Sequence, residues 1–160
     1  MYSERLMEKI QEIVKKWSGK EGELNSLSIH DLICALNQDT YGEGEVYLVI
    51  KQALINKLID LVQNVEKYPL KKELGSVYQI YLLIEPNFVN DMNRLFVISK
   101  RENKYFKEGY DYCLGVDYMP ETGDWYHGHY DAETPKTWEK YIEKKYGVAI
   151  PLLNKEGGIN

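Results

Sequence analysis

The sequence predicts an α+β protein with three N-terminal helices, an antiparallel β-meander of about four strands, and a C-terminal helix packed on the sheet. Up to residue 66, apolar residues recur every three or four positions, and after Gly75 the period becomes two. Two alternating segments then flank a turn, which is typical of a hairpin. Consecutive helices followed by consecutive strands favour the α+β class.

The helices are predicted over residues 3–17, 28–37 and 45–66, and a fourth follows Thr134. Ser28 with Asp31 three residues later resembles a capping box. Pro69 prevents the third helix from continuing. Pro135 suits the first position of the fourth helix, and Gly147 ends it.

Residues 77–84 are apolar on both faces, which indicates a central strand. A second strand is predicted over 95–99, although residues 88–100 also fit a helix, and 100–109 is predicted to be a polar loop. The hairpin strands are 110–119 and 124–131. The apolar segment 148–153 has no assigned type. We expect one domain over 1–153 and a loose tail over 154–160.

Composition narrows the class of protein. The chain has 160 residues, of which 44% are hydrophobic and 28% charged, as in one ordinary globular domain. We find no pattern of a signal peptide or a membrane span. The two cysteines suit a reducing compartment better than a disulfide framework. We therefore expect a cytoplasmic protein with no membrane association and no cofactor.

Charge is concentrated in one segment. The net charge is −5, which argues against direct nucleic-acid binding, and residues 110–135 carry six carboxylates and no basic side chain. Six aromatic residues are interleaved with them. Either this is an ordinary solvated hairpin, or it is a surface for a cationic partner. The carboxylates are Asp111, Asp117, Glu121, Asp124, Asp131 and Glu133.

The turn predicts a register for the hairpin. A four-residue loop over 120–123 pairs Met119 with Asp124 and Gly115 with Gly128, whereas an error of one residue would break the glycine match. Two opposed glycines form a bare saddle, which either a partner or the last helix of the same domain could occupy. Alternation places Trp125, His127, His129 and Asp131 on the core side. The opposite face holds Asp111, Cys113, Gly115, Asp117, Asp124, Tyr126, Gly128 and Tyr130.

His127 and His129 are the candidate metal ligands. Histidines two apart on a strand point the same way, and Asp131 offers a third ligand, but hydrogen-bonded structural histidines explain the pair as well. Cys113 as a nucleophile is disfavoured because alternation directs it away from both histidines. No catalytic residue is predicted.

These observations favour an acidic binding protein. The hairpin is predicted to inhibit or mask a basic partner protein, such as a nuclease or another nucleic-acid-binding protein, as immunity and anti-defence proteins do. The alternative is a metal-dependent enzyme centred on His127 and His129. A homo-oligomer paired through apolar strands is a third possibility, so the oligomeric state stays open. The predicted partner-binding residues are Asp111, Gly115, Asp117, Glu121, Asp124, Tyr126, Gly128 and Tyr130.

Overall fold

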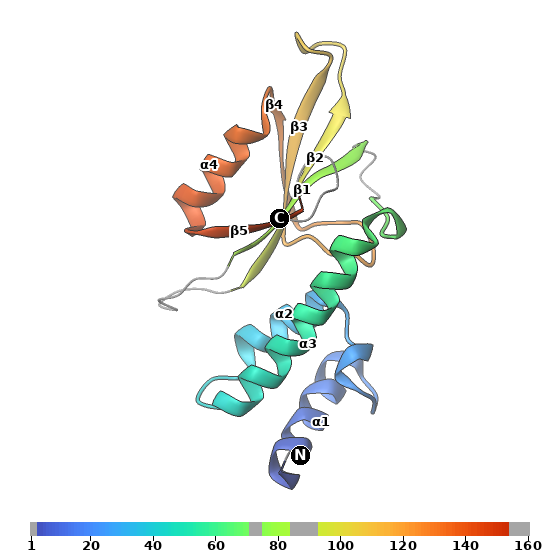
Figure 1. Ribbon diagram of the computed structural model, residues 1–160, viewed down its shortest axis with the longest axis vertical. Coiled ribbons are helices and arrows are strands. Elements are labelled where there is room, and N and C mark those ends of the chain that lie inside the picture. The colour runs from blue at the N-terminus through green and yellow to red at the C-terminus, as the bar shows by residue number, and fades with distance from the viewer. Residues whose placement is uncertain (1–2, 71–74, 84–92, 154–160) are drawn as a thin grey trace. The chain divides into compact units, whose positions relative to one another are not determined.

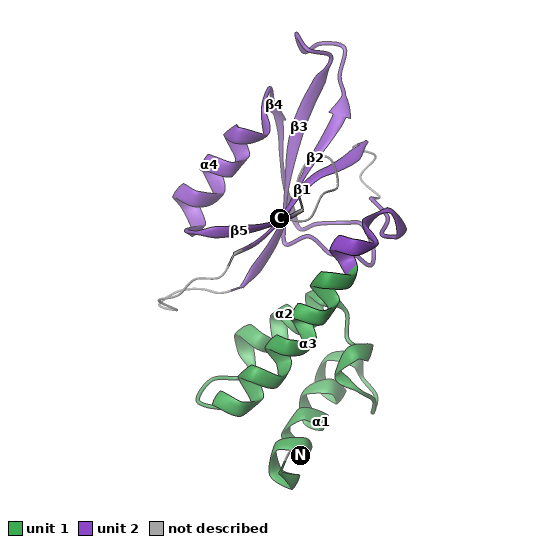
Figure 2. Cartoon of the chain, viewed as in Figure 1, with its two compact units in different colours: residues 1–60 green, residues 61–160 purple. Residues whose placement is uncertain are grey.

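The computed structural model describes residues 3–70, 75–83 and 93–153 (Figure 1). Its internal contacts divide the chain into two compact units, Met1–Asp60 and Leu61–Asn160 (Figure 2). The prediction of one domain over 1–153 stays a prediction, and the predicted tail at 154–160 lies outside the described residues. In the described part of the chain, no helix combines the length and apolar character needed to cross a membrane.

The first unit is helical, as predicted. Helix α1 spans Glu4–Ser18, α2 spans Ile29–Gln38, and α3 spans Gly44–Gln63 and so runs into the second unit. Short 3-10 turns occur at Leu24–Ser26 and Val65–Lys67.

Side-chain caps fix where the first two helices begin. The Ser3 hydroxyl accepts the Leu6 N–H at 3.2 Å, and the Ser28 hydroxyl accepts the Asp31 N–H at 3.0 Å. The predicted start of the second helix at Ser28 is therefore confirmed as its cap residue.

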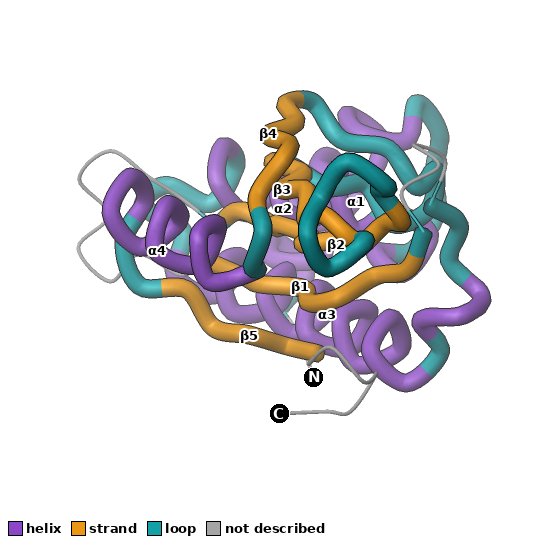
Figure 3. The backbone as a smooth tube through the Cα atoms, turned by 90° about the horizontal axis from the view of Figure 1, so that it is seen from above, coloured by secondary structure: helices purple, strands orange, loops and turns teal. Residues whose placement is uncertain are grey.

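The second unit contains a five-stranded antiparallel sheet in the order β4-β3-β2-β1-β5 (Figure 3). The first four strands form the predicted meander, and each is hydrogen-bonded to the next along the chain. They are joined by a fifth strand on the far side of β1. The strands are β1 Ser76–Leu83, β2 Arg94–Glu102, β3 Tyr110–Val116, β4 His127–Ala132 and β5 Ala149–Leu153.

Helix α4, Pro135–Tyr146, packs on one face of this sheet, which confirms the predicted C-terminal helix. Its Ile142 lies in a buried cluster with Phe96 and Leu114. Two polar contacts fix the docking: the Trp138 indole N–H donates to the Tyr112 carbonyl at 2.8 Å, and the Tyr81 hydroxyl donates to the Glu139 carboxylate. This face therefore combines apolar packing with directional bonds.

Several strand boundaries differ from the prediction, and the hairpin strands end at Val116 and begin again at His127 in place of the predicted 119 and 124. The segment 148–153 forms β5, which pairs Leu82 with Ile150 after α4 has carried the chain from one edge of the sheet to the other. Strand β2 runs on to Glu102, three residues into the predicted loop, because its backbone pairs with β3 as far as Tyr110. That extension places Arg101 opposite Asp111. Of the ambiguous segment 88–100, residues 94–100 are strand, and 88–92 lie outside the described residues.

Candidate functional site

The hairpin formed by β3 and β4 has the predicted register at its turn. Met119 bridges Asp124, and Gly115 pairs with Gly128. The Gly123 N–H donates to the Met119 carbonyl at 2.8 Å, and Gly123 has a φ of 76°, which glycine adopts without strain. The four-residue loop is thus confirmed.

Farther from the turn, one extra residue interrupts the pairing. Leu114 pairs with His129, but Tyr112 pairs with Ala132, so β4 bulges between them. Asp131 adopts a φ of 65° at this bulge. The prediction that Asp131 shares the core side with the histidines is therefore wrong, because the bulge turns its carboxylate toward Arg101 on the other face.

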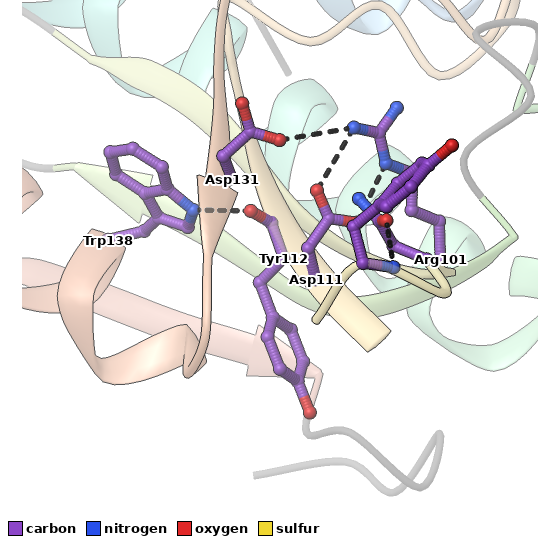
Figure 4. Close-up of polar contacts among 7 residues, drawn as sticks. Arg101, Asp111, Tyr112, Asp131 and Trp138 are labelled. Carbon is purple, nitrogen blue, oxygen red and sulfur yellow. Dashed lines mark hydrogen bonds and ion pairs between the residues drawn. The ribbon is translucent and has the colours of Figure 1, made fainter. Parts of the chain in front are cut away.

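Arg101 forms ion pairs with two acidic residues of the hairpin, Asp111 and Asp131 (Figure 4). Its Nε and Nη2 donate to the two carboxylate oxygens of Asp111 at 2.7 and 3.0 Å, and Nη2 lies 3.5 Å from Asp131 Oδ1. The Asp111 carboxylate is completely buried. Burial raises the pKa of Asp111, but the hydrogen bonds and charge of Arg101 outweigh this effect and lower it. The Asp111 carboxylate is therefore an interior group that is ion-paired with Arg101.

A second arginine of β2 neutralises Asp117. Arg94 Nη1 lies 3.1 and 3.0 Å from its two carboxylate oxygens. Asp117 has a φ of 57°, and the guanidinium also lies 5.4 Å from the centre of the Tyr146 ring. Although residues 110–135 carry no basic side chain of their own, arginines of β2 supply counter-charges to Asp111, Asp117 and Asp131.

The glycine saddle is filled by side chains of the hairpin itself. A Cβ atom built on Gly115 would lie 2.6 Å from Cδ2 of Trp125. One built on Gly128 would meet the Tyr130 hydroxyl and lie 2.8 Å from the Trp125 indole nitrogen. Trp125 and Tyr130 thus occupy the space directly over the two glycines, and the last helix, α4, packs on the opposite face of the sheet.

Trp125 reaches the saddle because the chain leaves regular pairing next to the turn. Between Val116 and His127 only the isolated Met119–Asp124 bridge continues the ladder, so strict alternation no longer applies to Trp125. It is 3% exposed and lies on the Gly115 face, whereas alternation predicted the face of Leu114.

The remaining predicted residues stay at the surface. Tyr126 is 63% exposed and Tyr130 is 42% exposed. Glu121 is exposed in the turn, and Asp124 is half-buried and accepts the Trp125 N–H at 2.9 Å. These four residues form what we call the turn surface: Glu121, Asp124, Tyr126 and Tyr130.

The two histidines lie on the face that α4 covers, as alternation predicted. The His129 ring is 4.8 Å from Tyr141 and 5.6 Å from Trp138, centre to centre. Burial, Lys145 and His127 together lower the pKa of His129. Within residues 3–70, 75–83 and 93–153, no group of three His, Cys, Asp or Glu side chains could hold a metal ion.

Cys113 has no reactive character. Its side chain is completely buried between Asp111 and Gly115, and burial raises the pKa of its thiol to about 11. At neutral pH the thiol is therefore protonated, whereas a nucleophile needs the thiolate.

Sequence reasoning missed the two arginines, which are the groups that decide how the hairpin carboxylates behave. Extending the strand ahead of Tyr110 by antiparallel pairing would have placed Arg101 opposite Asp111. No local pattern identifies Arg94, because it precedes Asp117 by 23 residues.

Comparisons with models of protein families, with curated proteins and with solved structures found no match.

Proposed function

We propose that this chain is a binding protein that masks a basic partner protein through the turn surface. The observation that carries the proposal is the exposure of Tyr126 and Tyr130 on a segment that holds six carboxylates and no lysine or arginine. Tyrosines on a surface supply large contact area at low entropic cost, and they are enriched at protein interfaces.

The electrostatics of the hairpin support a basic partner even after internal pairing. Residues 110–135 hold six carboxylates and no lysine or arginine, while Arg94 and Arg101 of β2 form ion pairs with Asp117, Asp111 and Asp131. Glu121 and Asp124 belong to the turn surface, where Glu121 is exposed and Asp124 is half-buried. An excess of this sign accelerates association with a cationic surface and disfavours an acidic one.

The proposed partner is a basic protein such as a nuclease or another nucleic-acid-binding protein. Immunity and anti-defence proteins bind partners of this class. This part of the proposal rests on charge complementarity alone. Asp111, Asp117, Gly115 and Gly128 drop out of the contact set because they are buried, paired or covered.

A capture experiment with matched variants tests the proposal. The wild-type chain is immobilised and exposed to a lysate of its native host, and each recovered protein is purified and titrated against the free chain. The test variant is E121Q/D124N/Y126S, in which the amide that replaces the Asp124 carboxylate still offers an oxygen acceptor to the Trp125 N–H. The control E8Q/E21Q/Y41S removes the same charges and one exposed tyrosine from the helical unit.

We expect a basic protein whose affinity falls at least about tenfold in the test variant and is unchanged in the control. The affinity should also weaken between low and physiological salt, because exposed charges are screened. Equal affinity of the test variant and the wild type for every recovered protein would overturn the proposal.

A further inference from the structure

The loop between β2 and β3, residues 103–109, holds its shape with its own hydrogen bonds. The Asn103 N–H donates to the Gly109 carbonyl at 2.8 Å, and the Phe106 N–H donates to the Asn103 carbonyl at 3.1 Å. The Asn103 side chain accepts the Tyr105 N–H at 3.1 Å. The backbone at Tyr105 is therefore fixed although the residue is 85% exposed, so the fold gains little from burying this ring.

This loop forms one wall of a groove at the end of the sheet. The start of β1 at Ser76 and the end of β2 from Lys100 to Glu102 line the rest of it, together with Tyr110. All these residues belong to the second unit. The groove lies at the opposite end of β3 from the turn that carries Glu121.

Two lysine–tyrosine pairs give the groove its chemistry. Lys100 Nζ lies 4.1 Å from the centre of the Tyr110 ring, and Lys104 Nζ lies 5.2 Å from the centre of the Tyr105 ring. Tyr110 is 40% exposed. At two places in the lining of this groove, a lysine amine therefore lies beside an exposed tyrosine ring.

The charge of the groove differs in sign from that of the whole chain. Among the described residues that line the groove, Lys100, Arg101 and Lys104 are cationic and Glu102 carries the one carboxylate. Arg101 is committed to Asp111, so the two lysines are the cations left for a ligand. The net charge of −5 argued against nucleic-acid ligands, but it does not describe this end of the sheet.

We propose that this groove binds a nucleotide, either free or within a single strand. Lys100 and Lys104 receive the phosphate, and the base stacks on Tyr105 or Tyr110. Basic side chains that track phosphates beside aromatic rings are the general means of binding single strands without reading their sequence. The Glu102 carboxylate suits an amino or hydroxyl donor of the base or sugar. This site is separate from the turn surface and does not depend on it.

Two probes test the proposal, the first by fluorescence anisotropy and the second by calorimetry. The first probe is a labelled oligothymidylate of about 12 nucleotides, a length within the range that small single-strand-binding domains cover. The second is AMP, titrated by calorimetry. The test variant is K104Q/Y105S. The control K140Q/Y41S removes one exposed lysine and one exposed tyrosine elsewhere, and circular dichroism verifies that both variants fold.

We expect the wild type to bind at least one probe, and K104Q/Y105S to bind that probe at least about tenfold more weakly while the control is unchanged. Binding of the oligonucleotide alone identifies a strand as the source, and binding of AMP identifies a free nucleotide. Binding of neither probe at millimolar concentration would overturn the proposal, as would equal loss in both variants. The turn variant E121Q/D124N/Y126S should bind the probes like the wild type, which separates this result from the masking function.

Discussion

The two ends of the hairpin carry the same kind of residue in opposite roles. At the base, Asp111 is buried in a two-point contact with Arg101, and Asp131 lies against the same guanidinium. At the turn, Glu121 is exposed and Asp124 is half-buried. The comparison shows that carboxylates from one acidic stretch of sequence take two roles. Some form an internal ion pair that holds strands together, and others are surface charges that face water.

The largest expected effect is at the base. Arg101→Ala leaves the buried Asp111 carboxylate without its partner, so we expect a loss of about 3 kcal/mol in the free energy of unfolding. Urea denaturation at neutral pH measures it. The double variant R101M/D111L removes both charges and should recover most of the loss. If R101A were as stable as the wild type, the carboxylates at the base would contribute no more to stability than those at the turn, which would contradict the comparison.

The next largest effect on stability is expected at the glycine saddle, which is formed by Gly115 and Gly128. Gly115→Ala places a methyl group 2.6 Å from Trp125, and we expect a loss of about 1–3 kcal/mol from overpacking. The control is Gly44→Ala, where an added Cβ meets nothing within 4 Å. Thermal unfolding compares the two variants, and equal stability would show that the indole moves aside without cost.

A smaller effect on stability is expected from the protonation of His129. Because burial, Lys145 and His127 lower the pKa of His129, the folded state binds fewer protons than the unfolded state just below the ordinary value of 6.5. The contribution of neutral His129 to the free energy of unfolding is fully present above pH 6.5, and it is lost as the pH falls through the pKa of His129 in the folded state. Denaturation curves between pH 8 and 5, pH values that bracket ordinary histidine titration, should show this loss in the wild type and less of it in His129→Phe.

His127→Phe is the matched variant for that measurement, because its ring is exposed on the same strand. An identical change of the pH profile in both variants would mean that the contact of His129 with α4 does not cause the effect.

The smallest effect is at the turn. Glu121→Gln changes an exposed side chain, and we expect the free energy of unfolding to shift by less than about 0.5 kcal/mol. The same urea series as for R101A measures it. A loss near that of R101A would place Glu121 in an internal network and erase the difference between the two ends.

Much of the fold could be predicted from local patterns. Helix caps at Ser3 and Ser28, the turn over 120–123 and the pairing of Gly115 with Gly128 depend on residues close together in the chain. Local chemistry is therefore sufficient for them. The segment 148–153 is short and apolar, and only its pairing with β1 makes it a strand.

The candidate site was predicted less well, because its electrostatics depend on neighbours in space. Residues 110–135 carry six carboxylates and no lysine or arginine, a pattern that favours a surface for a cationic partner. Strand β2 brings Arg94 and Arg101 alongside β3, and the bulge at Asp131 turns a third carboxylate toward the same cluster. No sequence pattern within residues 110–135 predicts the pairing with these arginines or the bulge.

By itself, the amino-acid sequence of this protein determined the order of helices α1 to α4 and strands β1 to β4 and the geometry of the turn over 120–123, since these depend on backbone preferences and contacts over a few residues. Only the tertiary structure decided which charges face water. A carboxylate is a surface group or an interior one according to whether a guanidinium from another strand reaches it, because an unpaired charge is too costly to bury. Asp111, which Arg101 reaches, is buried, whereas Glu121, ten residues later and of equal charge, is exposed in the turn.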